Sequence, residues 1–292
     1  MILLEQSNHI VETTLNNCIS SLKDGKLAPF ELTCADFDGV IFHLNLPKDK
    51  NVLSLSIDVP CYDKLVDCGV EKNIKAIYKD HVVKPEPNAS VTLALNLDTL
   101  SSSPPSLISE LSLLKRHILA SAFYHTFEAV EAKKSILLDI PFHGDDRTFI
   151  TTKDESVIVV ITVNFKDSED IVFGKVFLNE FKKSVSGAPA VDFSTTPPGE
   201  ISSIKNLQKA DGYITCVLFE RHYKADFRDK TINLILMLRN YLMYHIKCSK
   251  SQLNTRMRLR VEALLKILNR AKQELPKEKK TASGRTFTRT TK

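Results

Sequence analysis

The chain has 292 residues with a net charge of +5, and 43% of them are apolar and 26% charged, which suits one or two soluble globular domains. No apolar run approaches the roughly 18 residues that a membrane-spanning helix needs. The opening MILLEQSNHI lacks the basic start of a signal peptide, so we expect a cytoplasmic protein.

The six cysteines point to the same compartment. None of them forms a CxxC pair, and their neighbours are apolar or helical, so we expect reduced thiols rather than disulfides or a zinc site. They are Cys18, Cys34, Cys61, Cys68, Cys216 and Cys248.

The first half of the chain predicts a helix followed by antiparallel hairpins. In the strands, apolar and polar residues alternate, as Leu53, Leu55 and Ile57 do with their polar neighbours. We expect helices at Ile2–Leu22 and Leu107–Glu131, strands at Phe30–Ala35, Val40–Leu46, Val52–Val59 and Val91–Leu97, and short helices within Tyr62–Lys79.

The second half repeats this plan, with several hairpin strands, a detour and a last strand that leads into a helix. The loop Ser184–Ser203 is rich in Ser, Thr and Pro, and we assign it no structure or role. We expect strands at Ile136–Ile140, Thr148–Thr152, Val157–Phe165, Ile171–Phe181 and Gly212–Phe219.

The predicted fold class is therefore α+β, with two similar domains, each an antiparallel sheet with flanking helices, plus one long C-terminal helix. A parallel doubly wound fold would need strict alternation of strand and helix, which this order lacks. We place the first domain at 1–125, the second at 126–226, the long helix at 227–272 and a basic, mobile tail at 273–292.

The long helix is the most informative segment. The chain has no Gly or Pro from Tyr213 to Leu275, and apolar residues recur every three or four positions from about Arg228 to Ala271. Such a helix is roughly 60 Å long at about 1.5 Å per residue. The recurring apolar residues form a stripe along one face of this helix. Because a compact domain of this size cannot bury the whole stripe, we expect another protein to cover its far end.

Charge separates the same segment from the rest of the chain. Residues 247–292 hold 14 Lys and Arg against three acidic residues, a net charge of +11, and residues 1–246 are net −6. Such asymmetry indicates contact with an acidic surface, which nucleic acid, anionic lipid or an acidic protein filament could supply. A solvated helix face is the alternative, and the charge count alone does not separate the two.

The motif Asp36-Phe37-Asp38-Gly39 resembles the DxDG of haloacid-dehalogenase-type phosphatases, where the first Asp is the nucleophile and the second a general acid beside Mg²⁺. His143-Gly144-Asp145-Asp146 offers a second acidic pair. We prefer a hairpin turn, because Asp and Gly are favoured turn residues and the flanking strands are not parallel strands with helical crossovers. A Mg²⁺-dependent phosphohydrolase that uses Asp36 and Asp38 stays the alternative function.

Other chemistry-bearing motifs are missing from the sequence. It has no GxGxxG, P-loop, HExxH or GxSxG, and we expect no catalytic, cofactor-binding or metal-binding residues. His117, His125 and His245 fit packing positions on helices. Phe287 is the only aromatic residue after Tyr244, so the basic end lacks the stacking residues of a nucleic-acid reader. We expect no nucleic-acid partner and no membrane insertion.

The chain resembles the p34-type subunits of the actin-related protein 2/3 (Arp2/3) complex. The resemblance runs from the first residues to near the last, and the long-helix segment is its most specific part. The motifs are MILLE at 1–5, ADFDGV at 35–40, GKVFLNEF at 174–181, GYITCVLFERH at 212–222, TINLILMLRNYLMYHIKCSK at 231–250, TRMR at 255–258 and LKILNRA at 265–271.

This resemblance implies a non-catalytic scaffold of two α/β domains whose long helix pairs with the long helix of a smaller companion subunit. Together the two subunits would hold the actin-related subunits and contact the side of a mother actin filament, from which a branch grows. It also implies a place in the actin cytoskeleton, in cortical protrusions and at other sites of branched actin assembly.

Two sets of residues on the long helix carry these implied contacts. The filament-binding set is Lys247, Lys250, Arg256, Arg258, Lys266 and Arg270. The partner-helix set is Leu242, Ile246, Leu253, Met257, Val261, Leu264 and Leu268.

Overall fold

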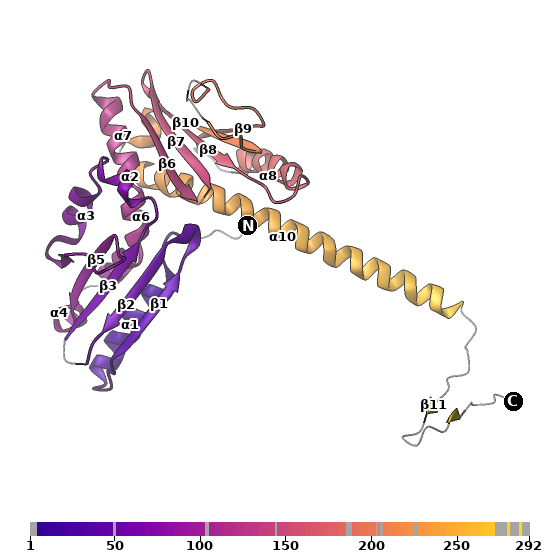
Figure 1. The fold of residues 1–292 in the computed structure, drawn as a ribbon, viewed down its shortest axis with the longest axis horizontal. Coiled ribbons are helices and arrows are strands. Elements are labelled where there is room, and N and C mark those ends of the chain that lie inside the picture. The colour runs from indigo at the N-terminus through magenta and orange to yellow at the C-terminus, as the bar shows by residue number, and fades with distance from the viewer. Residues whose placement is uncertain are drawn as a thin grey trace. The chain divides into compact units, whose positions relative to one another are not determined.

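We analysed a computed structural model of the chain (Figure 1), which describes residues 5–48, 51–102, 105–143, 145–184, 189–202, 204, 207–224, 227–271, 279–280 and 286–287. Two compact units divide the chain, residues 1–246 and residues 247–292. The first unit holds two five-stranded sheets with their helices, and both sheets contribute to the main apolar core of that unit.

The first sheet is wholly antiparallel, with strand order β1-β2-β3-β5-β4. Its register pairs Cys34 with Phe42, Leu44 with Leu55, and Leu55 with Leu93. The strands are β1 (Phe30–Ala35), β2 (Ile41–Leu46), β3 (Val52–Asp58), β4 (Val82–Val83) and β5 (Val91–Asn96).

The second sheet repeats this order as β6-β7-β8-β10-β9, again with antiparallel neighbours throughout. In both sheets a three-stranded meander comes first, the fifth strand pairs with the third, and the fourth lies at the edge. The strands are β6 (Leu137–His143), β7 (Asp146–Lys153), β8 (Ser156–Val163), β9 (Ala190–Ser194) and β10 (Gly212–Leu218). The predicted repetition and the α+β class are confirmed.

The apolar run of β8 is explained by burial on both faces of the sheet. Val157 and Val159 point into the main core, whereas Ile158 and Val160 point into a second cluster on the opposite face. A strand covered on both sides needs no polar alternation, which is why β8 reads as VIVVITV and β3 as alternating. The first sheet lies within residues 1–125 and the second within 126–226.

Helices cover the sheets of the first unit (Figure 1). The first of them, α1, begins at the N-cap Asn8, whose side chain accepts a hydrogen bond from the backbone N–H of Val11. The helices are α1 (His9–Lys23), α2 (Tyr62–Val66), α3 (Val70–Tyr78), α4 (Leu97–Ser102), α5 (Pro105–Ser112), α6 (Leu114–Leu119), α7 (Ser121–Glu131), α8 (Asp170–Ser184), α9 (Glu220–Tyr223) and α10 (Phe227–Arg270).

One predicted strand was wrong. Ile171–Phe181 lies within helix α8, where the buried Asp170, Gly174 and Leu178 are four residues apart. The segment is rich in Val and Phe, which favour strands, but its burial follows the helical period, and tertiary packing overrides local propensity. The sequence also suggested one helix over Leu107–Glu131, where the structure has α5, α6 and α7 in succession.

Several short elements were not predicted, among them β4, α4, β9 and α9. Of these, β9 lies in the segment that we left unassigned. The predicted tail at 273–292 lies outside the described residues, except for the pairing of Lys279–Lys280 (β11) with Thr286–Phe287 (β12). Among the described helices, none has a stretch apolar and long enough to cross a lipid bilayer.

Candidate functional site on the long helix

The first half of α10 is bound into the core of residues 1–246. Arg116 of α6 donates to the Asp229 carboxylate at 2.9 Å and to the Asn233 side chain at 2.8 Å. Tyr124 of α7 donates to the same Asp229 oxygen at 3.0 Å. The buried residues of this half are Thr231, Ile232, Ile235, Leu236, Leu238, Asn240, Tyr241, Leu242 and Ile246.

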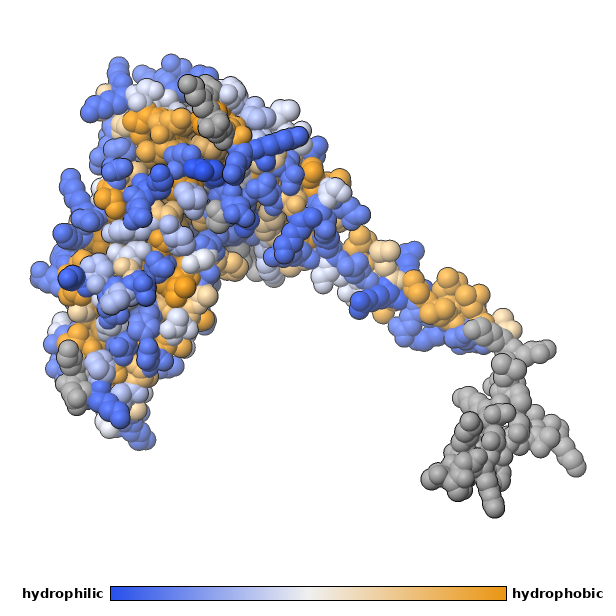
Figure 2. Space-filling view, viewed as in Figure 1, coloured by the Kyte–Doolittle hydropathy of each residue, from blue (hydrophilic) through white to orange (hydrophobic). Residues whose placement is uncertain are grey.

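The second half of α10, from Lys247 to Arg270, is exposed along its whole length except at the half-buried Lys250. At about 1.5 Å per residue this half is on the order of 35 Å long. Figure 2 shows apolar patches among hydrophilic residues on it. Its exposed large apolar residues are Leu253, Met257, Leu259, Val261, Leu264, Leu265, Ile267 and Leu268.

Two members of the partner-helix set do not belong to that exposed surface. Leu242 and Ile246 are buried in the chain's own core, so they have no free area to offer to a second helix. The near end of the stripe therefore packs within the chain's own fold. The remaining members of the set are Leu253, Met257, Val261, Leu264 and Leu268, all about half exposed.

The spacing of these five residues suits a helix pair. At about 100° per residue they fall within an arc of roughly 80°. From Met257 the steps are four, three and four residues to Leu268, which places Met257 and Leu264 at heptad d positions and Val261 and Leu268 at a positions. A β-branched residue at a and Leu at d suits a two-stranded seam.

The cations of this half lie on two flanks of the stripe. By the same geometry, Arg256, Lys266 and Arg270 fall on one flank or opposite the stripe, and Lys247 and Arg258 on the other flank. Lys250 is in line with the stripe. Lys266 pairs with Glu262 at 3.7 Å, one helical turn away. Cations thus lie on both sides of the stripe.

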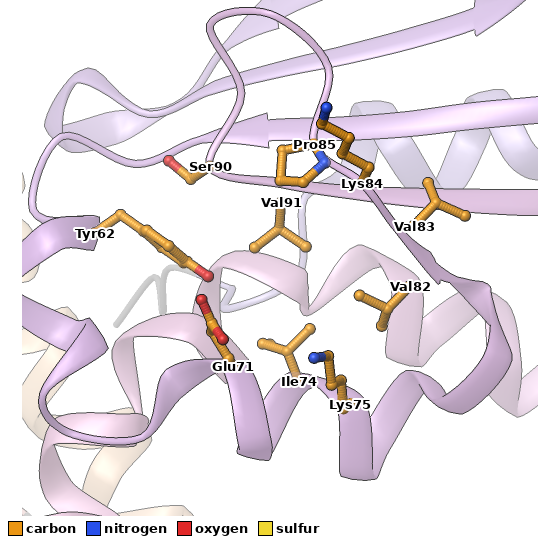
Figure 3. Close-up of a pocket in the computed structure, with 10 residues that line it drawn as sticks. All are labelled: Tyr62, Glu71, Ile74, Lys75, Val82, Val83, Lys84, Pro85, Ser90 and Val91. Atoms are coloured by element: carbon orange, nitrogen blue, oxygen red, sulfur yellow. The ribbon is translucent and has the colours of Figure 1, made fainter.

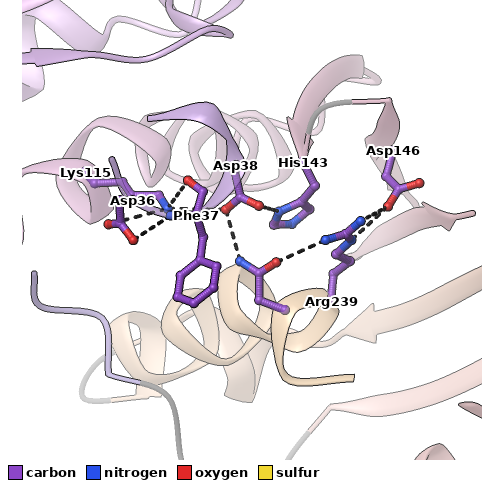
Figure 4. A network of polar contacts seen from close by, with 8 residues as sticks. Asp36, Phe37, Asp38, Lys115, His143, Asp146 and Arg239 are labelled. Carbon is purple, nitrogen blue, oxygen red and sulfur yellow. Dashed lines mark hydrogen bonds and ion pairs between the residues drawn. The ribbon is translucent and has the colours of Figure 1, made fainter. Parts of the chain in front are cut away.

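The Asp36–Gly39 motif is the turn between β1 and β2, as the hairpin interpretation predicts. Asp38 has a positive φ of 69°, next to Gly39 at 73°, which a tight turn allows for Asp and Gly. In Figure 4 the Asp38 carboxylate points toward His143, and Lys115 reaches the same turn. Lys115 Nζ lies 3.3 Å from Asp38 Oδ2, 3.7 Å from Asp36 Oδ2 and 3.0 Å from the Phe37 carbonyl oxygen.

Two further groups reach Asp38 from the second sheet and from α10. The Asn240 amide donates to Asp38 Oδ2 at 3.0 Å, and His143 Nδ1 lies 2.9 Å from Asp38 Oδ1. The contact between the His143 imidazole and the Asp38 carboxylate is an ion pair when the imidazole is protonated. Burial alone would raise the pKa of Asp38, but His143, Lys115 and Asn240 lower it to about 2.

That low pKa bears on the phosphatase interpretation. A general acid must be protonated before it acts, and a carboxyl group with a pKa of about 2 is ionised near pH 7. Both sheets are antiparallel, whereas the phosphatase fold needs parallel strands with helical crossovers. Among the described residues no group of three or more His, Cys, Asp or Glu side chains is arranged to hold a metal ion. The geometry gives Asp38 a structural role.

The second acidic turn is held in a matching way. His143–Asp146 connects β6 to β7, the same position in the second sheet that Asp36–Gly39 has in the first. Asp146 accepts from Arg239 Nε at 2.8 Å and from the Asn164 side chain at 2.9 Å. In each repeat, a helix that follows the last strand supplies a cation, Lys115 or Arg239, to the carboxylate of the first turn (Figure 4).

A pocket of about 350 Å³ lies between α2, α3 and the β4–β5 hairpin. In Figure 3 the apolar side chains of Ile74, Val82 and Val91 line the pocket together with charged and polar side chains. Burial, and to a lesser degree Glu71, raises the pKa of the Tyr62 hydroxyl. The remaining lining residues are Glu71, Lys75, Val83, Lys84, Pro85 and Ser90. The set holds no nucleophile paired with a base.

The predicted packing histidines differ in their surroundings. His117 Nδ1 contacts the Tyr78 hydroxyl at 2.8 Å, and burial, with help from Arg116, lowers the pKa of His117 to about 4. His245 stacks on Phe177 with ring centroids 5.0 Å apart. The structure places His125 half-buried on α7. None of them belongs to a described metal-binding group.

Sequence reasoning missed the roles of four residues in the polar cluster that joins the two turns and α10, namely Lys115, His143, Arg239 and Asn240. They lie 77, 105, 201 and 202 positions after Asp38, so no local pattern links them to it. The one available signal was the paired appearance of DxDG and HGDD. The two motifs mark equivalent turns in the two repeats.

Comparisons with known proteins agree on one family. Residues 55–275 match the family described as "Arp2/3 complex, 34 kD subunit p34-Arc". A protein named "Actin-related protein 2/3 complex subunit 2" from Schizosaccharomyces pombe is 33% identical over 99% of this chain and 100% of its own length. A protein of the same name from Dictyostelium discoideum is 36% identical over 87% of this chain and 89% of its own.

Proposed function

Because the chain belongs to the p34-Arc family of Arp2/3 complex subunits, we propose that it is the scaffold subunit through which this complex contacts the side of a mother actin filament. In this role it carries no catalytic site. It works in the actin cytoskeleton, where the complex nucleates branched filaments. The observation that carries the proposal is the exposed second half of α10, with an apolar stripe and cations on one helix.

The apolar stripe is the seat of a partner helix. Leu253, Met257, Val261, Leu264 and Leu268 are each about half exposed in this chain, and a soluble protein rarely leaves such a row uncovered. Burying apolar area contributes roughly 25 cal/mol per Å². The heptad spacing favours a helix of similar length, as the long helix of a smaller companion subunit in the same complex would supply.

The cations are the filament-binding element. Actin filaments present acidic surfaces. Cations on one helix attract such a surface before contact is made, which speeds the encounter between the complex and the filament. Exposed ion pairs contribute on the order of 0–1 kcal/mol each, so filament binding needs several of them together. The proposed set is Lys247, Lys250, Arg256, Arg258, Lys266 and Arg270.

The buried polar cluster supports this role from within the first unit. Arg239 and Asn240 tie α10 to Asp146 of the second sheet and Asp38 of the first. Breaking a buried charge pair costs several kcal/mol, so the helix is firmly held where it leaves the core. A continuous helix keeps the spacing of its own cations fixed, so less conformational entropy is lost on binding.

The test is charge reversal in the assembled complex. A variant with Lys247, Lys250, Arg256 and Arg258 changed to Glu should keep its companion subunits and lose mother-filament binding and branching. Filament co-sedimentation and counting of branches by fluorescence microscopy measure the two effects. The matched control reverses Lys23, Lys26, Lys64 and Lys72, which are exposed on the first unit.

Normal branching by the first variant would remove those four cations from the filament contact. Equal loss of branching in both variants would mean that net charge, rather than the helix surface, sets filament binding. Loss of assembly in the first variant would place the cations in a subunit interface instead.

A further inference from the structure

The exposed half of α10 carries a second apolar row that the partner-helix stripe does not include. Leu259, Ala263 and Ile267 are four residues apart and form an oblique ridge on the helix surface. Leu259 is 60% exposed and Ile267 is 64% exposed, the latter being more than any other large apolar residue of the described chain. We call these three residues the ridge.

One partner helix on the stripe cannot cover the whole ridge. At about 100° per residue, Leu259 lies roughly 160° from the centre of the stripe, at heptad position f, and Ala263 lies at position c. In a two-stranded pair these positions face solvent and are ordinarily charged or polar. Ile267 is at position g, beside the seam.

The ridge lies among cations. By the same geometry Arg256, Lys266 and Arg270 fall within about 80° of the ridge centre at Ala263, on the flank away from Arg258. The acid Glu262 lies about 100° away from Ala263 and pairs with Lys266. Arginine is enriched among the residues that contribute most to the binding energy of protein contacts.

We propose that the ridge inserts into an apolar groove of an acidic protein surface, with Arg256, Lys266 and Arg270 pairing around its rim. The proposal rests on the proposed function, in which that surface is the side of the actin filament. It adds an apolar anchor, Leu259, to a contact that charge alone would make. Charge complementarity and continuity with the proposed filament-binding cations favour this occupant over a second copy of the chain.

The two contributions respond differently to salt. Ion pairs at an exposed rim are screened as the Debye length falls from about 10 Å at 0.1 M salt to about 3 Å at 1 M. Burial of an apolar side chain is not screened in this way. Removing the ridge should therefore weaken filament binding by a similar factor at every salt concentration, whereas removing cations should flatten the salt dependence.

The experiment uses the whole complex with this chain carrying Leu259→Gln, alone and with Ile267→Gln. Both changes keep the charge and a good helix former. Co-sedimentation with actin filaments between about 50 and 300 mM KCl should show at least about tenfold weaker binding for the pair, with an unchanged salt slope. A second variant, Arg256→Gln with Lys266→Gln and Arg270→Gln, should bind more weakly at low salt and show a shallower slope.

The matched control removes equally exposed apolar area elsewhere. Val172→Gln with Val176→Gln on α8 changes two residues that are 63% and 59% exposed, and filament binding should stay as in the unaltered complex. Analytical ultracentrifugation of the complex checks the other occupant, because a ridge-dependent dimer would overturn the proposal.

Unchanged filament binding by the ridge variants, together with weaker binding by the cation variant, would overturn the ridge and leave the proposed function standing. Unchanged binding by both would count against the filament contact itself. Failure of the Leu259→Gln variant to assemble would assign the ridge to a subunit interface and also overturn this proposal.

Discussion

The two halves of α10 have the same helical period and opposite surroundings. From Thr231 to Ile246 most of the apolar residues are buried in the chain's own core, whereas from Lys247 to Arg270 a similar row is exposed. The comparison teaches that periodicity identifies the face of a helix but not what covers it. Four changes, ordered from the largest expected effect to the smallest, test that difference.

The largest effect should come from Arg239→Met in the buried half. The change leaves the Asp146 carboxylate, which is 3% exposed, without its cation, and losing one partner of a buried pair costs about 3–5 kcal/mol. Urea unfolding of the isolated chain measures this loss in the free energy of unfolding. The control is Arg147→Met, whose pair with Asp139 is more than a third exposed and should be worth less than about 1 kcal/mol.

Leu242→Ala and Leu264→Ala make the same chemical change in the two halves. The first opens a cavity at a fully buried position and should destabilise the isolated chain by about 2–5 kcal/mol. The second should leave the isolated chain within about 0.5 kcal/mol of the original and weaken assembly with companion subunits. Equal destabilisation of the isolated chain would show that its own residues cover Leu264.

Acid should loosen the buried half through Asp38. The folded pKa of Asp38 is lowered from 3.8 to about 2, so its stabilising contribution is present above pH 4 and is lost as pH falls toward 2. The expected contribution is about 2 kcal/mol. Stability curves of the chain and of Asp38→Asn between pH 2 and 5 should converge at the acid end, and parallel curves would contradict the shift.

The smallest effect should come from Glu262→Gln in the exposed half. Its pair with Lys266 spans one helical turn on the surface and should contribute about 0.3–0.5 kcal/mol to helicity. Circular dichroism of a peptide covering residues 247–271, recorded at low salt, measures the loss of helicity. A loss above about 1 kcal/mol would mean that the pair is shielded from water.

Much of the fold could be predicted because its signals are local. Alternation in β3, turn residues between strands and the absence of Gly and Pro after β10 set the strands and the long helix. The α8 segment failed because Val and Phe favour a strand locally, while contacts with distant residues such as Leu242 decide its packing.

The site divides along the same line. The exposed stripe and its cations could be predicted from the hydrophobic period and the composition of the sequence. Both signals lie within a few turns of one helix. The exclusion of Leu242 and Ile246 from the partner face did not follow, because burial depends on the two sheets packed against them. The cluster around Asp38 joins four remote segments, and no single window of sequence contains it.

That cluster also links the finished fold to the synthesis of the chain. The Asn240–Asp38 bond joins residues 202 positions apart, and closing so long a loop is slow. Before residues 239 and 240 have been synthesised, the Asp146 carboxylate lacks its Arg239 partner and the Asp38 carboxylate lacks the Asn240 amide. The first sheet, although complete by residue 96, therefore reaches its final state only after nearly all of the first unit has been synthesised.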